Sequence, residues 1–151
     1  MPKSKETEPL ATEVWRILFD FIVATRDQRV RALARHALTP NDSRALFALD
    51  AEGRTMRSLA REWECDASNA TFIVDRLEAR GLVRRRSPER DRRVKLVALT
   101  ARGTRTRLAL AEEMYRPPPE LVALGRRDLE TLLAAVQKLR PEPDAPAPGA
   151  R

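Results

Sequence analysis

The fold is decided by residues 55–100, which read TMRSLAREWECDASNATFIVDRLEARGLVRRRSPERDRRVKLVALT. Thr55 opens a short helix at the start of this stretch. The apolar side chains of that helix are Leu59, Ala60 and Trp63. Residues 64–66 form a tight connection, and Asp66 caps a second helix that Gly81 ends. Its apolar positions recur at helical spacing, at Ala70, Ile73, Val74 and Leu77. The stretch therefore predicts two short helices joined by a three-residue turn.

After Gly81 the apolar pattern changes from helical spacing to that of extended strands. Residues 82–86 and 94–99 are apolar or β-branched runs, and residues 87–93, which include Arg90, Arg92 and Arg93, join them. A two-stranded hairpin is marginal by itself in water, so it must pack on the helices before it. We therefore predict a mainly α fold with a small two-stranded β wing, which is a winged helix-turn-helix.

Long helices flank this region, because none of the 11 prolines interrupts residues 10–39, 41–87 or 89–116. Apolar spacing predicts helices over 10–35, 101–115 and 126–139, and Thr39-Pro40 opens another. The first and last helices are too apolar to stand alone, so they pack on each other, on a second subunit, or on both. The predicted organisation is a flexible N-terminus (1–9), a helical dimerisation region (10–38 and 101–139), a winged helix-turn-helix region (39–100) and a disordered tail (140–151).

The charge is concentrated in one third of the chain. Residues 54–107 carry 15 Lys or Arg and 7 Asp or Glu, a net charge of +8, whereas the whole chain has +7. Such a basic segment is typical of a polyanion partner, and its alternative is a solvated basic face. The sequence shows neither a signal peptide nor an apolar run that could cross a bilayer, and its single cysteine excludes an internal disulfide. We expect a cytoplasmic protein.

The second helix of such a pair fits the major groove of double-stranded DNA, and its N-terminal residues reach base edges. The outward side chains predicted to contact DNA are Ser68, Asn69, Thr71, Phe72 and Arg76. The alternative for Ser68 and Asn69 is helix capping or simple exposure. In the wing, Arg90, Arg92 and Arg93 suit a minor groove, and Arg84 and Arg86 suit phosphates. The alternative for the wing tip is a solvated turn in which Asp91 pairs with a neighbouring Arg.

Two runs resemble the MarR family of bacterial transcription regulators. Asp75-Arg76-Leu77-Glu78-Ala79-Arg80-Gly81-Leu82-Val83 is similar to the end of that family's recognition helix. Asp91-Arg92-Arg93-Val94-Lys95-Leu96-Val97-Ala98-Leu99-Thr100-Ala101-Arg102-Gly103 is similar to its wing and the start of the next helix. With Leu59-Ala60-Arg61, the resemblance covers about residues 10–139. Phe72 departs from the family, because many members carry a basic residue there, and Pro117–Pro119 shorten a helix that is often longer.

The resemblance implies a homodimer that joins through its first and last helices and binds a pseudo-palindromic operator, with half-sites about 10 bp apart. It further implies a repressor that releases DNA when a small aromatic or phenolic ligand binds. Side chains that could line a ligand pocket are Trp15, Arg16, Phe19, His36 and Phe47. Their alternatives are core packing for the aromatic residues and helix-terminus capping for His36.

Other classes of function are poorly supported. A single histidine, no Cys/His cluster and no Gly-rich phosphate loop argue against an enzyme, a metal site or a cofactor. The serious rival is an architectural or RNA-binding winged helix that contacts phosphates without reading bases. A third reading is a protein-interaction module whose basic wing is incidental.

Overall fold

The computed structural model describes residues 4–88, 91 and 93–139, which divide into two compact units, residues 1–116 and 117–151. Unit 1 contains helices α1 (Ser4–Ala24), α2 (Arg26–Arg35), α3 (Pro40–Ala48), α4 (Met56–Glu62), α5 (Ala67–Ala79) and α6 (Ala101–Met114). Its strands are β1 (Arg54–Thr55), β2 (Val83–Arg86) and β3 (Leu96–Leu99). Unit 2 contains α7 (Pro119–Val122) and α8 (Arg126–Gln137). The predicted disordered tail, residues 140–151, lies outside the described residues.

The first predicted helix is two helices that meet at Thr25, and it begins at Ser4, earlier than expected. Thr25 donates its hydroxyl to the carbonyl of Phe21 at 2.8 Å, and the Arg29 guanidinium donates to the carbonyl of Ile22. The Phe21 carbonyl still accepts the backbone N–H of Thr25 at 3.0 Å, whereas the Ile22 carbonyl accepts from the side chains of Thr25 and Arg29. The prediction of one helix over 10–35 is therefore wrong, because apolar periodicity does not register such local competition.

The sheet has three strands and not the two that we predicted. β3 lies in the middle and pairs antiparallel with β1 and β2, in the order β1-β3-β2. β2 and β3 form the predicted hairpin, with Val83 opposite Leu99 and Arg86 opposite Leu96. We did not predict β1, because a strand of two residues is too short to show the alternating pattern of a strand.

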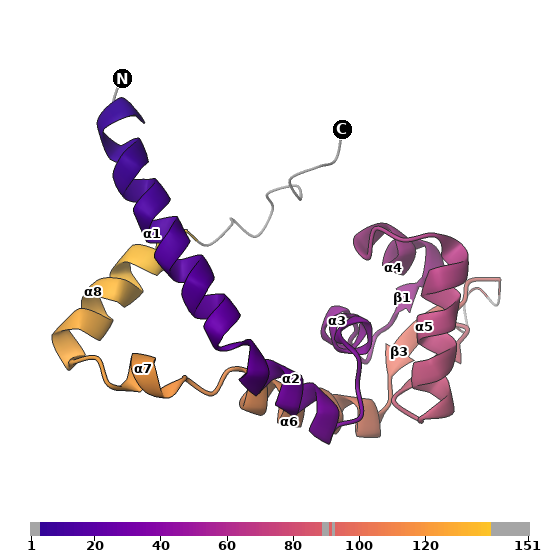
Figure 1. Cartoon of the computed structure of the whole chain (residues 1–151). Helices are drawn as coiled ribbons and strands as arrows, with labels where there is room; N and C mark the ends of the chain where they lie inside the picture. Colours follow the sequence, from indigo (N-terminus) through magenta and orange to yellow (C-terminus); the bar gives the residue numbers. More distant parts are fainter. Residues whose placement is uncertain (1–3, 89–90, 92, 140–151) are drawn as a thin grey trace. The chain divides into compact units, whose positions relative to one another are not determined.

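The core of unit 1 joins the helix-turn-helix to the sheet. Side chains with less than 2% exposure come from α3, α4, α5 and α6 and from the strands, and they include Leu46, Leu59, Leu77, Val97 and Leu110. Within unit 1, α4 packs on α5, α3 packs on α5, and α2 lies along α6 (Figure 1). The second helix of the predicted pair is thereby held firmly against the wing.

The junction of wing and α6 depends on close backbone approach. Thr100 caps α6 by accepting the backbone N–H of Gly103 at 2.9 Å, and its hydroxyl donates to the carbonyl of Gly81 at 2.7 Å. A Cβ at Gly103 would lie 1.9 Å from the Leu82 carbonyl oxygen. This contact explains why a glycine stands at position 103, in the first turn of α6.

Candidate nucleic-acid interface

The predicted helix-turn-helix is formed by α4, a turn and α5. Glu64 takes a left-handed conformation (φ 51°) in the turn, and the N–H of Cys65 bonds to the carbonyl of Ala60 at 3.1 Å. Asp66 then caps α5, as predicted, by accepting the N–H of Asn69 at 2.7 Å. The hydrogen bond from the Ser68 hydroxyl and that from the Asn69 N–H lower the pKa of Asp66 below its ordinary value. The start of α5 is therefore fixed by a charged cap.

The N-terminal half of α5 presents an exposed face of Ser68, Asn69, Thr71 and Phe72. The Ser68 hydroxyl donates to Asp66 at 2.6 Å and the Thr71 hydroxyl donates to the carbonyl of Ala67 at 2.8 Å. Both hydroxyl hydrogens are thus used within the protein, which leaves their lone pairs to accept from amino groups of adenine or cytosine. The Asn69 amide can both donate and accept.

Arg76 is held against the start of α3 by hydrogen bonds. Its guanidinium donates Nε–H to Oδ1 of Asp42 at 2.9 Å and Nη2–H to Oγ1 of Thr39 at 3.1 Å. The Asp42 side chain is only 2% exposed, whereas that of Arg76 is 34% exposed. Asp42 also completes a capping box with Thr39 at the start of α3. The prediction of Arg76 as a DNA contact did not anticipate this pair, because a buried aspartate 34 residues away leaves no local signal.

The C-terminal half of α5 is joined to the sheet by an ion-pair network. Arg85 on β2 contacts Asp75 at 2.6 Å and also pairs with Glu78. Partial burial lowers the pKa of Arg85, but the hydrogen bonds and charges of Asp75 and Glu78 outweigh that effect and raise it. This half of α5 therefore keeps its acidic side chains paired, and the exposed hydrogen-bonding groups lie in the first half.

The wing arginines divide between the two faces of β2. Arg85 turns back to α5, whereas Arg84 and Arg86 alternate with it and are exposed. Arg86 donates to the carbonyl of Glu52, so it is less available than Arg84. Arg93 is exposed, and its backbone N–H donates to Asp91 at 2.9 Å. The predicted contacts Arg90 and Arg92 lie outside the described residues.

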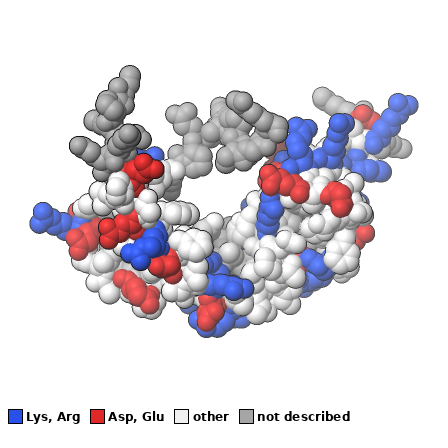
Figure 2. Space-filling model, turned by 45° about the horizontal axis from the view of Figure 1, so that its top comes forward, with Lys and Arg blue, Asp and Glu red and all other residues white. Residues whose placement is uncertain are grey.

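Two basic side chains on α4 were not among the predicted contacts. Arg57 and Arg61 are exposed and lie four residues apart, so they share one face of the helix. Figure 2 shows Lys and Arg side chains gathered over the end of unit 1 that carries α4, α5 and the strands. The i, i+4 spacing on the first helix of the pair was the signal that could have identified them.

The five predicted pocket residues are distributed over several local contacts. The rings of Trp15 and Phe19 lie 6.2 Å apart on α1, where Trp15, Arg16 and Phe19 are exposed. His36 Nε2 lies 3.0 Å from Glu113 on α6, which also binds Arg35. Hydrogen bonds from Arg35 and His36 lower the pKa of Glu113, against the effect of desolvation. Phe47 contacts Tyr115 with ring centroids 6.5 Å apart.

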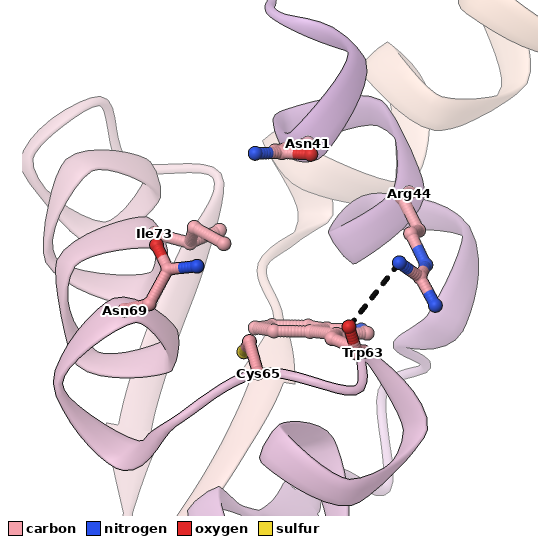
Figure 3. A pocket seen from close by; sticks show the side chains of 6 residues that line it. All are labelled: Asn41, Arg44, Trp63, Cys65, Asn69 and Ile73. Carbon is pink, nitrogen blue, oxygen red and sulfur yellow. Dashed lines mark hydrogen bonds between the residues drawn. The ribbon is translucent and has the colours of Figure 1, made fainter.

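A pocket lies elsewhere, between α3, the helix-turn-helix turn and α5. It is lined by Asn41, Arg44, Trp63, Cys65, Asn69 and Ile73 (Figure 3). Arg44 donates to the carbonyls of Trp63 and Glu62 at 3.2 and 2.9 Å, so its charge caps the end of α4. None of the five predicted pocket residues lines this cleft.

Two general findings bear on other classes of site. No helix in the described part of the chain is both long and apolar enough to span a bilayer. Nor do the residues that the structure describes bring three or more His, Cys, Asp or Glu side chains together in a metal-binding arrangement.

The fold and this surface define a winged helix-turn-helix protein. The YusO protein from Bacillus subtilis has a similar structure, with a TM-score of 0.71, 21% identity, and coverage of 87% of this chain and 95% of that one. The MepR–DNA complex from S. aureus has a TM-score of 0.66 and 22% identity, and the match covers 82% of this chain and 96% of that one. The transcriptional regulator BldR from Sulfolobus solfataricus has a TM-score of 0.59 and 29% identity, and the match covers 92% of this chain and 97% of that one.

The MarR family model matches residues 36–94, which contain α3, the helix-turn-helix and most of the wing. No curated protein matches the sequence. The family match over residues 36–94 and the structural neighbours confirm the resemblance to the MarR family predicted from the sequence, and the chain has the winged helix-turn-helix fold of those neighbours.

Proposed function

We propose that this protein is a sequence-specific transcription regulator that binds double-stranded DNA through α5 and the wing. The observation that carries the proposal is the division of α5 into two halves. Its first half exposes hydrogen-bonding groups at Ser68, Asn69 and Thr71, whereas Asp75 and Glu78 in its second half are paired with Arg85. Recognition helices contact bases with their N-terminal residues.

The surrounding charge supports the same orientation. The base-reading face that we propose consists of Ser68, Asn69, Thr71 and Phe72 on α5. Arg57 and Arg61 are exposed on α4, which packs on α5, and Arg84 and Arg93 carry positive charge in the wing. The first helix of a helix-turn-helix crosses the DNA backbone, where such side chains neutralise phosphates. MepR from S. aureus, one of the structural neighbours, forms a complex with DNA, which supports this partner for a related fold.

We further propose a homodimer that binds a pseudo-palindromic operator. Helix α1 exposes a long apolar face, with Val14, Ile17 and Ile22 each about half exposed. Unit 2 exposes Leu133 and Leu139 on and beyond α8. Apolar faces of this extent mark protein interfaces. A two-fold dimer would place two copies of α5 about one helical turn of DNA apart.

Ligand-responsive repression is the most specific part of the proposal and rests on the family. The exposed Trp15 and Phe19 on α1 offer aromatic surface to a phenolic or other aromatic ligand. Such a ligand would release DNA only by binding more tightly to the DNA-incompetent arrangement. A shift of the DNA titration curve on adding salicylate as a probe would support this part.

The decisive experiment is titration of the purified protein into its own upstream intergenic DNA and into a scrambled duplex, both near 0.15 M salt. Specific regulation predicts a preference of about a thousandfold or more, with one dimer per site. The rival, an architectural or RNA-binding winged helix, predicts a ratio near one, because phosphates are identical in both duplexes. That second outcome would refute sequence-specific regulation at this DNA.

A further inference from the structure

Phe72 is the unusual residue of the base-reading face. It is 61% exposed, and no other large apolar side chain on the described length of α5 is exposed to that degree. Its neighbours on the face, Ser68 and Thr71, are small and polar. Burial of an aromatic ring is favourable, and Phe72 does not gain that free energy in the free protein. Its exposure therefore indicates that the ring is covered when a partner binds.

The ring is also held in place. The guanidinium of Arg76 lies 5.2 Å from the ring centroid, one turn further along α5. Arg76 is itself fixed by the buried carboxylate of Asp42. A cation over an aromatic face attracts it, and the anchored guanidinium therefore limits the movement of the ring. Phe72 is thus presented as a preorganised apolar group.

The major groove offers few partners for such a group. Base edges there carry hydrogen-bond donors and acceptors, and the C5-methyl group of thymine is the apolar exception. A phenyl ring can neither donate to a base edge nor bind a phosphate, so a methylated pyrimidine is the complementary ligand. 5-Methylcytosine presents the same methyl group at the same ring position.

We propose that Phe72 is a specificity-determining residue that contacts the C5-methyl group of a pyrimidine in each half-site. The inference rests on the proposed function, because it requires α5 to enter the major groove. Burial of one methyl group corresponds to about a fourfold change in affinity for each half-site.

The test uses the full-length protein and the operator found by the titration above. Each thymine is replaced in turn by deoxyuridine, which removes only the methyl group. We expect one position in each half-site to lose about three- to fivefold in affinity with the wild type. Phe72→Ala should bind more weakly and no longer distinguish thymine from deoxyuridine, whereas Phe72→Leu should retain part of the discrimination.

Thr71→Ser is the matched control, because it removes the neighbouring methyl group from the same face while the ring stays. It should leave the deoxyuridine effect unchanged. Thermal unfolding of each variant checks that the exposed substitution preserves the fold. At the sensitive position, a C·G pair with and without cytosine methylation distinguishes the two sources. If cytosine methylation raises the affinity of the wild type but not of Phe72→Ala, Phe72 recognises the methyl group of thymine and of 5-methylcytosine alike. If methylation does not raise the affinity, Phe72 recognises thymine alone.

Two results would overturn the inference. One is specific binding in which no deoxyuridine substitution weakens the wild type. The other is a methyl effect of unchanged size in Phe72→Ala. Equal binding of operator and scrambled duplexes by the wild type would instead refute the proposed function, so the two failures are distinguishable.

Discussion

Replacement of Arg76 by alanine should destabilise the protein and leave its phosphate contacts intact. The Asp42 carboxylate that Arg76 binds is almost completely buried, and its remaining donor would be the backbone N–H of Thr39 at 2.8 Å. Removal of one partner from a buried ion pair costs about 3–5 kcal/mol. Because Arg76 is one-third exposed and Thr39 still donates, we expect about 3 kcal/mol, a fall in Tm of roughly 6–12 °C.

Urea unfolding followed by circular dichroism, at one fixed protein concentration, measures this loss. Asp42→Asn removes the charge but keeps an acceptor for Thr39, so it should recover part of the stability lost in Arg76→Ala. The double variant should show a coupling of about 1–3 kcal/mol between the two positions.

The dependence of DNA affinity on salt separates this role from a direct phosphate contact. At a temperature where both proteins are folded, Arg76→Ala should keep the wild-type slope of log K against log salt. A phosphate contact would instead make the slope shallower by about 0.9. A stability change below about 0.5 kcal/mol together with a shallower slope would refute the structural role of the Arg76–Asp42 pair and support Arg76 as a phosphate contact.

The described geometry supports three more predictions. Gly103→Ala should lower the free energy of unfolding in urea by about 2 kcal/mol, because its Cβ would lie 1.9 Å from the Leu82 carbonyl oxygen. The control Gly125→Ala, whose Cβ would meet no atom within 4 Å, should change it by less than about 1 kcal/mol. Equal effects of the two substitutions would contradict the steric account. Arg84→Ala should leave Tm unchanged and make the salt slope shallower by about 0.9, and an unchanged slope would remove it from the phosphate contacts. The lowered pKa of Asp66 means that its contribution to stability is present above its unfolded pKa and lost as pH falls through the folded value. From about pH 5 downward, the free energy of unfolding should therefore decrease more steeply in the wild type than in Asp66→Asn. Parallel curves for the two proteins would exclude this role of Asp66.

The local architecture could be predicted from sequence because its signals lie within a few residues. Thr39, Thr55 and Asp66 are helix caps, and the structure confirms each of them. The change from helical spacing to strand spacing after Gly81 identified the hairpin of the wing. A cap needs only its own side chain and the next three N–H groups, so short sequence patterns are sufficient to reveal it.

The sequence defined only part of the surroundings of the α5 face that we propose reads bases. Ser68, Asn69, Thr71 and Phe72 are exposed where helical periodicity placed them. Helical periodicity indicates the direction in which a side chain points from its helix, but not which residues of other elements it meets there. It therefore grouped Arg76 with these residues, and it did not pick out Arg57 on the preceding helix.

Tertiary structure alone decided the partners of the arginines. Arg76 pairs with Asp42 across 34 residues, Arg85 turns from the wing to α5, and Arg54 and Thr55 become an edge strand beside β3. An exposed and a paired arginine look identical in a sequence, because the energy of an ion pair depends on distance and burial. Those quantities exist only once separate elements have packed together.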